Sequence, residues 1–174
     1  DQIDNGGLYT DAGDAAEEYA AQLNKIYILE QQLAAMRSKF DEYTYMEENA
    51  KSGEEYVQAI AAQNSVLKTQ ITLTEDLVEA EKAQQDSLYN NLGALKDSVT
   101  IINGRLVPIM SKYVNLSDES QELLDTTVES YNDLSEGISE NTMAIQENSD
   151  AIEANIQKLE DKTVEFYDIM ADAI

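Results

Sequence analysis

The chain of 174 residues contains no Cys, no His and no Trp, and it has only one Pro and seven Gly. Without thiols and imidazoles it can form no disulfide and no Cys or His metal site, and it lacks the usual nucleophile systems. A hydrophobic content of 43% is too high for a disordered acidic tail. We therefore expect a folded, non-enzymatic protein with no catalytic, cofactor-binding or metal-binding residues.

Positive charge is also scarce, because 11 Lys and Arg face 35 Asp and Glu for a net charge of -24. Such a chain is repelled by phosphate backbones and by anionic membrane surfaces. No window approaches the roughly 18 uninterrupted apolar residues that a bilayer span requires. We therefore expect partner proteins or self-association through helix faces, with no nucleic acid and no direct membrane contact.

The apolar pattern predicts an all-α fold of long helices, forming an elongated coiled coil or an up-down bundle. Turn signals place an acidic loop at 1–13, before one helical domain over 14–174. Capping boxes at Asp14–Glu17 and Ser52–Glu55, and an N-cap at Ser117, mark helix starts. Breaks are expected near 49–53, 103–108 and 115–117, which gives helices at about 14–49, 54–102, 105–115 and 118–173. The last helix runs to the end of the sequence without a stop signal, so we expect a fragment of a larger protein.

The segment 99–109 allows two structures. Asn103-Gly104 between β-branched residues is a strong hairpin signal. However, one heptad frame runs through the segment, from Val57 and Ile60 to Tyr113 and Leu116. A helix here would carry Gly104 inside it and lose a hydrogen bond at Pro108, which together cost roughly 3 to 4 kcal/mol. We favour a kinked helix, with a β-hairpin or open loop as the alternative.

A seven-residue repeat is the most distinctive feature of the last predicted helix. One heptad position carries Asn141, Asn148 and Asn155, and the other carries Ile138, Ile145, Ile152 and Leu159. Buried Asn side chains cost stability but fix register and oligomeric state. Small neutral flanks widen the buried stripe, which favours a trimer or a multi-helix bundle, although the charge of the last segment counts against a trimer. These seven residues are the predicted packing or oligomerisation row.

Residues 138–159 resemble the stalk repeats of trimeric autotransporter adhesins and of some phage fibres, in which Asn recurs at one core position. The segment Ile138-Ser-Glu-Asn141-Thr142-Met-Ala-Ile145 is similar to their hydrophobic-x-x-Asn-Thr pattern, although only this first repeat carries the Thr. The Gln-, Glu-, Ala- and Tyr-rich helices also resemble coiled-coil stretches of bacteriophage tail tape-measure proteins. The resemblance implies a structural role and favours a virion or extracytoplasmic location.

The leading hypothesis is a helical spacer or scaffold, in a phage tail or a surface fibre. The alternative is an extracytoplasmic sensory four-helix bundle of the chemoreceptor type, since four helices of about 35 to 40 residues would also account for the length. Compact size and adjacent termini would favour the bundle, whereas a long trimer or hairpin would favour the scaffold.

Overall fold

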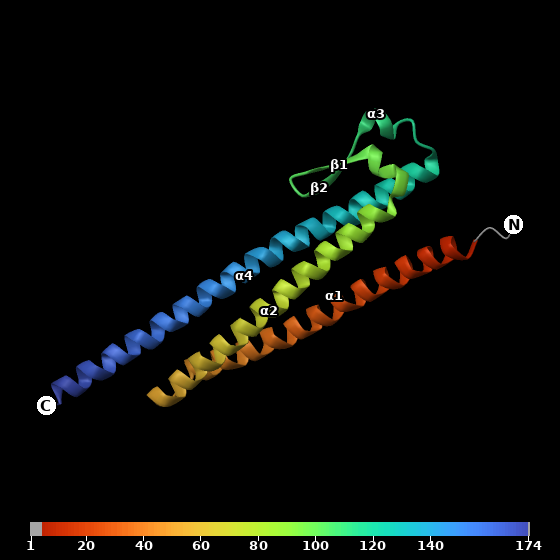
Figure 1. Ribbon diagram of the computed structural model, residues 1–174. Helices are drawn as coiled ribbons and strands as arrows, with labels where there is room; N and C mark the ends of the chain where they lie inside the picture. Colours follow the sequence, from red (N-terminus) through yellow and green to blue (C-terminus); the bar gives the residue numbers. More distant parts are fainter. Residues whose placement is uncertain (1–4, 174) are drawn as a thin grey trace. The chain divides into compact units, whose positions relative to one another are not determined.

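The computed structural model describes residues 5–173, and from residue 13 onward it also describes the side chains. Three long helices dominate it: α1 (Asn5–Glu48), α2 (Gly53–Asn91) and α4 (Asp118–Asp172). Between α2 and α4 lie a 3₁₀ helix, η1 (Gly93–Ser98), two strands, β1 (Val99–Ile102) and β2 (Arg105–Pro108), and the short helix α3 (Met110–Tyr113). The predicted all-α bundle of long packed helices is confirmed (Figure 1).

The chain forms two compact units, and each contains a stretch of all three long helices. The first comprises residues 1–28 and 77–141, and the second comprises residues 29–76 and 142–174. In both units α2 packs against α1 and against α4, so α2 is the central helix and buries the widest face. The core of the first unit gathers Leu92, Val99, Leu106, Leu124 and Tyr131, where the end of α2 meets the strands and the start of α4.

The helix starts follow two of the three capping signals. Ser52 Oγ accepts a hydrogen bond from the Glu55 N–H at 3.1 Å, while the Glu55 carboxylate accepts one from the Lys51 N–H at 2.8 Å. Ser117 Oγ accepts one from the Ser120 N–H at 3.3 Å. These bonds satisfy N–H groups that the first helical turn leaves unpaired. The predicted helix starts after 52 and at 118 are confirmed.

The prediction at the N-terminus is wrong for residues 5–13. The helix α1 already begins at Asn5, so Asp14 lies inside it and caps nothing. The predicted turn signals at Asn5, Gly6, Gly7 and Gly13 do not interrupt the helix. Residues 1–4 of the predicted loop lie outside the described residues.

The prediction that a helix continues to residue 102 is also wrong. Helix α2 ends at Asn91, and 99–108 forms an antiparallel β-hairpin in which Ile102 pairs with Arg105. The turn residues Asn103 (φ 51°) and Gly104 (φ 75°) both have positive φ, as a type I′ turn requires. The predicted helix at 105–115 is reduced to the single turn of α3. The hairpin avoids placing Gly and Pro inside a helix. It also puts the four β-branched residues of β1 in extended backbone, which they favour.

One of the two predicted buried rows of α2 is displaced. Ile60, Leu67, Thr74 and Glu81 are buried as expected. The second buried row is formed by Gln63, Gln70, Leu77 and Gln84. The predicted frame instead places the seven-residue steps from Val57 in this row, and three of them, Asn64, Ile71 and Val78, are only half-buried. Because α2 packs against two helices, its buried face is wider than a two-helix heptad frame assumes.

Candidate functional site

Two of the three repeated asparagines of α4 are hydrogen-bonded to α2. In the first unit the Asn141 amide donates to Glu81 Oε1. In the second unit Asn155 is 4% exposed, and its amide donates to Asn64 Oδ1 at 2.8 Å and to Gln63 Oε1 at 3.2 Å. A trimer built on these two amides would therefore have to break bonds made within one chain.

The remaining residues of the predicted row lie on the same side of α4. Asn148, Ile138, Ile145, Ile152 and Leu159 are all half-buried. Within the part of the chain that the structure describes, the Asn148 side chain makes no hydrogen bond. The asparagine row is thus bonded to α2 near residues 141 and 155 and packed without amide bonds at 148.

A buried glutamine of α2 joins the three helices of the second unit. Gln63 is 2% exposed, and its Nε2 donates to Glu47 Oε2 of α1 at 2.7 Å and to the Tyr43 carbonyl at 3.2 Å. Its Oε1 accepts from Asn155 of α4. Both ends of one amide are therefore used, each toward a different helix. We call Glu47, Gln63, Asn155 and Lys158 the three-helix node.

Lys158 of α4 completes the node by donating to Glu47 Oε1 at 2.8 Å. The Glu47 side chain is only 14% exposed. Burial on its own raises the pKa of the Glu47 carboxyl, but the hydrogen bonds from Lys158 and Gln63 and the Lys158 charge outweigh burial, so the pKa lies below its usual 4.5. The node therefore holds an ionised carboxylate between α1 and α4 at neutral pH.

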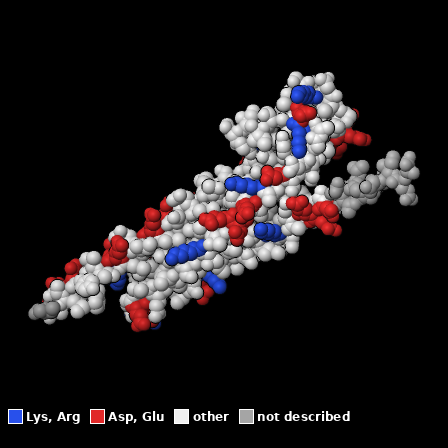
Figure 2. Space-filling model, viewed as in Figure 1, with Lys and Arg blue, Asp and Glu red and all other residues white. Residues whose placement is uncertain are grey.

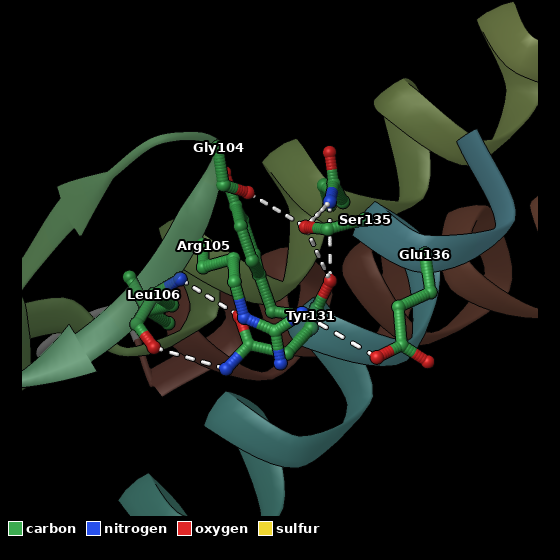
Figure 3. Close-up of polar contacts among 8 residues, drawn as sticks. Gly104, Arg105, Leu106, Tyr131, Ser135 and Glu136 are labelled. Atoms are coloured by element: carbon green, nitrogen blue, oxygen red, sulfur yellow. Dashed lines mark hydrogen bonds and ion pairs between the residues drawn. The ribbon is translucent and has the colours of Figure 1, made fainter. Parts of the chain in front are cut away.

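The β-hairpin is docked on α4 through backbone groups of β2 (Figure 3). Asn132 Oδ1 accepts from the Leu106 N–H at 2.8 Å, and Asn132 Nδ2 donates to the Leu106 carbonyl at 3.0 Å. Leu106 itself is 1% exposed in the core of the first unit. One amide side chain thus takes the place of a neighbouring strand.

A second contact holds the turn of the hairpin. The Ser135 hydroxyl lies 2.6 Å from the Gly104 carbonyl and 3.1 Å from the Tyr131 carbonyl, either of which can accept its proton. Gln85 Nε2 donates to Ser135 Oγ at 2.7 Å and to the Tyr131 carbonyl at 3.1 Å. The chain of bonds therefore links α2, α4 and the hairpin (Figure 3).

Arg105 and Glu136 lie at the rim of the docked hairpin. Their Nη1 and Oε1 atoms are 3.5 Å apart, and the side chains are 50% and 65% exposed. An exposed pair of this kind contributes about 0 to 1 kcal/mol. The buried amide contacts, and not this ion pair, hold the hairpin.

An apolar surface lies near the end of α4 in the second unit. A shallow groove of about 300 Å³ is lined by Val57 of α2 and by Phe166 and Ile169 of α4, among others. Phe166 and Ile169 are 59% and 60% exposed, although they continue the predicted heptad positions. This α4 segment also exposes the acidic residues Glu160, Asp161, Glu165, Asp168 and Asp172, of which Glu165 lines the groove.

Neither a metal site nor a membrane-spanning helix is found among the described residues. Among them, no three acidic side chains gather closely enough to hold a metal ion. No described helix carries an apolar stretch that could cross a membrane.

Sequence analysis missed the buried and bonded polar side chains outside the asparagine row. Gln63, Gln70 and Gln84 recur at multiples of seven, which is a periodic signal that could have found the second row of α2. Asn132 and Ser135 have no such signal, because their partners are backbone groups of a hairpin 26 and 31 residues away.

Comparison with protein-family models, with curated proteins and with solved structures finds no match to this chain.

Proposed function

We propose that this protein is a non-enzymatic helical spacer or scaffold that binds other proteins through its helix faces. The observation that carries the proposal is the pairing of buried amides between helices, above all at the three-helix node. Hydrogen bonds are directional, so the bonds of Gln63 to α1 and α4 allow one register, whereas apolar side chains alone tolerate sliding. A spacer needs such a fixed register because its length must not vary.

The exposed apolar residues of α4 supply a face for binding. Phe166, Ile169 and Met170 are 48% to 60% exposed and lie on one side of the helix, within about one turn of each other. Contiguous exposed apolar surface of this kind marks an interaction site, because soluble monomers rarely expose large apolar patches. A location in a phage tail or a surface fibre rests on the sequence resemblance of residues 138–159.

The alternative function, a four-helix sensory bundle, has less support. It needs four long helices of similar length, and the described residues contain three, of 44, 39 and 55 residues. The segment between α2 and α4 is occupied by the hairpin and two short helical turns. We therefore favour the spacer.

Matched removal of one heptad from each long helix tests the proposal. Deleting 33–39, 70–76 and 143–149 together removes facing segments of α1, α2 and α4 and preserves the node. A spacer should tolerate this change, melt within a few degrees of the parent and shorten by about 10 Å in solution scattering, because seven residues rise 1.5 Å each.

Deleting 143–149 alone is the control. It shifts the node residues Asn155 and Lys158 by one heptad relative to Gln63 and Glu47, so this variant should melt well below the parent. If the matched triple deletion unfolds, or if it melts no higher than the single deletion, the three helices do not keep one register along their length and the proposal fails.

A further inference from the structure

The two edges of the β-hairpin differ in their free backbone groups. In the register of the hairpin, Ile102 and Arg105 form the hydrogen-bonded pair next to the turn, so Ile101 and Leu106 form the following non-bonded pair. The N–H and C=O groups of Ile101 and Leu106 therefore point away from the partner strand. They are the groups that a further strand would use.

The outer edge of β2 is closed. Asn132 takes both backbone groups of Leu106, and Ser135 contacts the Gly104 carbonyl. Pro108, the next outward residue, has no N–H to offer. No additional strand can pair along this side without displacing α4 side chains.

The outer edge of β1 is open at Ile101, whereas the Val99 N–H is bonded to the Lys96 carbonyl. Within the described residues, the Ile101 N–H and C=O make no hydrogen bond, and the side chain is 49% exposed. The β1 edge carries no proline, no charged residue and no bulge, which are the features that usually protect an edge. Beside it, the outer face of the hairpin exposes Ile102 (53%) and Val107 (36%).

The segment around the hairpin is basic in an otherwise acidic protein. Residues 93–117 contain Lys96, Arg105 and Lys112 but only one acid, Asp97. Figure 2 shows blue side chains on this part of the molecule. Pairing two hairpins through this edge would bring two basic segments together, which disfavours a second copy of the chain as the occupant. An acidic partner fits both the local charge and the open edge.

We propose that the outer edge of β1 binds an extended, acidic segment of another protein, which adds a third strand antiparallel or parallel to β1. The bound strand would exchange backbone hydrogen bonds with Ile101 and place alternate β-branched side chains beside Thr100 and Ile102, the outer-face residues of β1. Acidic residues at its ends would face the basic groups of 93–117. This interaction is independent of the spacer function, because it involves neither the three-helix node nor the end of α4.

Synthetic peptides test the proposal directly. The probe is a fluorescent peptide with the central sequence Val-Thr-Val-Thr-Val and two Glu at each end, and the control peptide carries Lys in place of every Glu. At about 0.15 M salt, where charges more than about 8 Å away are largely screened, we expect the Glu peptide to bind the full chain at least ten-fold more tightly than the Lys peptide. Equal binding, or no binding below millimolar concentration, would overturn the proposal.

Two variants of one residue test the edge itself. Ile101→Pro removes the outward N–H but breaks no bond of the β1–β2 ladder, whereas Ile101→Thr keeps the N–H and the strand propensity. We expect the first to weaken Glu-peptide binding at least ten-fold and the second to change it by less than about three-fold. Unchanged binding by Ile101→Pro would show that the edge is not used.

If Ile101→Pro disturbs the hairpin, the amide chemical shifts of the parent protein provide an independent test. Addition of the Glu peptide should shift the Ile101 amide and leave the Leu106 amide, which is bonded to Asn132, almost unmoved. The opposite pattern would contradict the proposal. A parent protein that sediments as a dimer and becomes a monomer on Ile101→Pro would instead identify a second copy as the occupant and overturn the acidic partner.

Discussion

The side-chain amide of Asn132 satisfies both backbone groups of Leu106, at 2.8 Å for the N–H and 3.0 Å for the carbonyl. Asn132 lies on α4, and Leu106 lies 26 residues earlier on β2. The contact gives a two-stranded hairpin the third partner that it otherwise lacks, since an isolated hairpin is marginally stable in water. The hairpin and the first turns of α4 should therefore unfold together.

Replacing Asn132 by Ala should destabilise the protein by about 2 kcal/mol, because two backbone groups of a buried residue lose their partners. Urea unfolding measures the change in free energy, and hydrogen exchange of the Leu106 amide should accelerate. Asp133→Ala, one position along the same helix and exposed, is the control and should stay within about 0.5 kcal/mol of the parent. Slow exchange of the Leu106 amide in Asn132→Ala would contradict this account.

Two adjacent glutamines of α2 should respond to the same substitution in opposite directions. Gln84 and Gln85 are 1% and 8% exposed. Within the described residues, neither Nε2 nor Oε1 of Gln84 has a hydrogen-bond partner, whereas Gln85 Nε2 bonds to Tyr131 and Ser135. An unpaired buried amide costs about 1 to 3 kcal/mol, and a paired one does not.

Met has nearly the volume of Gln and no polar group to satisfy. Gln84→Met should therefore raise the free energy of unfolding by about 1 kcal/mol, while Gln85→Met should lower it by a similar amount or more. Thermal and urea unfolding of the two variants provide the comparison. Destabilisation of both proteins would mean that the Gln84 amide has a partner, such as an ordered water, in solution.

The long helices could be predicted from the sequence because their signals are local. The capping residues Ser52 and Ser117 bond N–H groups three residues ahead, and apolar residues recur at helical spacing along each element. Such patterns depend on residues close in sequence and not on which helices pack together. The seven-residue spacing also places Asn141 and Asn155 on one face of the last helix, and both amides bond to α2.

The hairpin was misjudged because two local signals conflicted there. A heptad frame passed through 99–109 and favoured a helix, while Asn103-Gly104 favoured a turn with positive φ. The deciding contacts come from Asn132 and Ser135 of α4, which bind backbone groups that no sequence pattern identifies. The second buried row of α2 was missed for a related reason, since a central helix with two neighbours buries positions that a heptad frame assigns to the surface.

Gly137 should resist replacement by Ala, although Ala is the better helix former. A Cβ at this position of α4 would collide with the Glu81 carboxylate of α2. Glu81 is 5% exposed and accepts a bond from Asn141, so its carboxylate is not free to move aside. We expect Gly137→Ala to lower the free energy of unfolding by about 1 to 3 kcal/mol, as overpacking does.

Gly13→Ala is the matched control for that substitution. Gly13 also lies inside a helix, α1, and nothing lies within 4 Å of an added Cβ. There the higher helix propensity of Ala should stabilise by up to about 1 kcal/mol. Stabilisation by both substitutions, measured by thermal unfolding, would show that α2 and α4 are not in close contact at Gly137.

The three-helix node predicts a defined pH dependence of stability. Because the pKa of the Glu47 carboxyl is lower in the folded than in the unfolded protein, the folded state binds fewer protons at this group. Its contribution to stability is therefore fully present above the unfolded value of about 4.5, and it is lost as the pH falls from there through the folded pKa.

Glu47→Gln should accordingly destabilise the protein more at pH 7 than at pH 3, measured by urea unfolding. Glu48→Gln removes one charge from the neighbouring exposed position and corrects for the general relief of repulsion in a chain of net charge -24. If the difference between the two variants is the same at both pH values, the bonds from Lys158 and Gln63 do not hold an ionised carboxylate, and the node does not connect α1 to α4 in the way described.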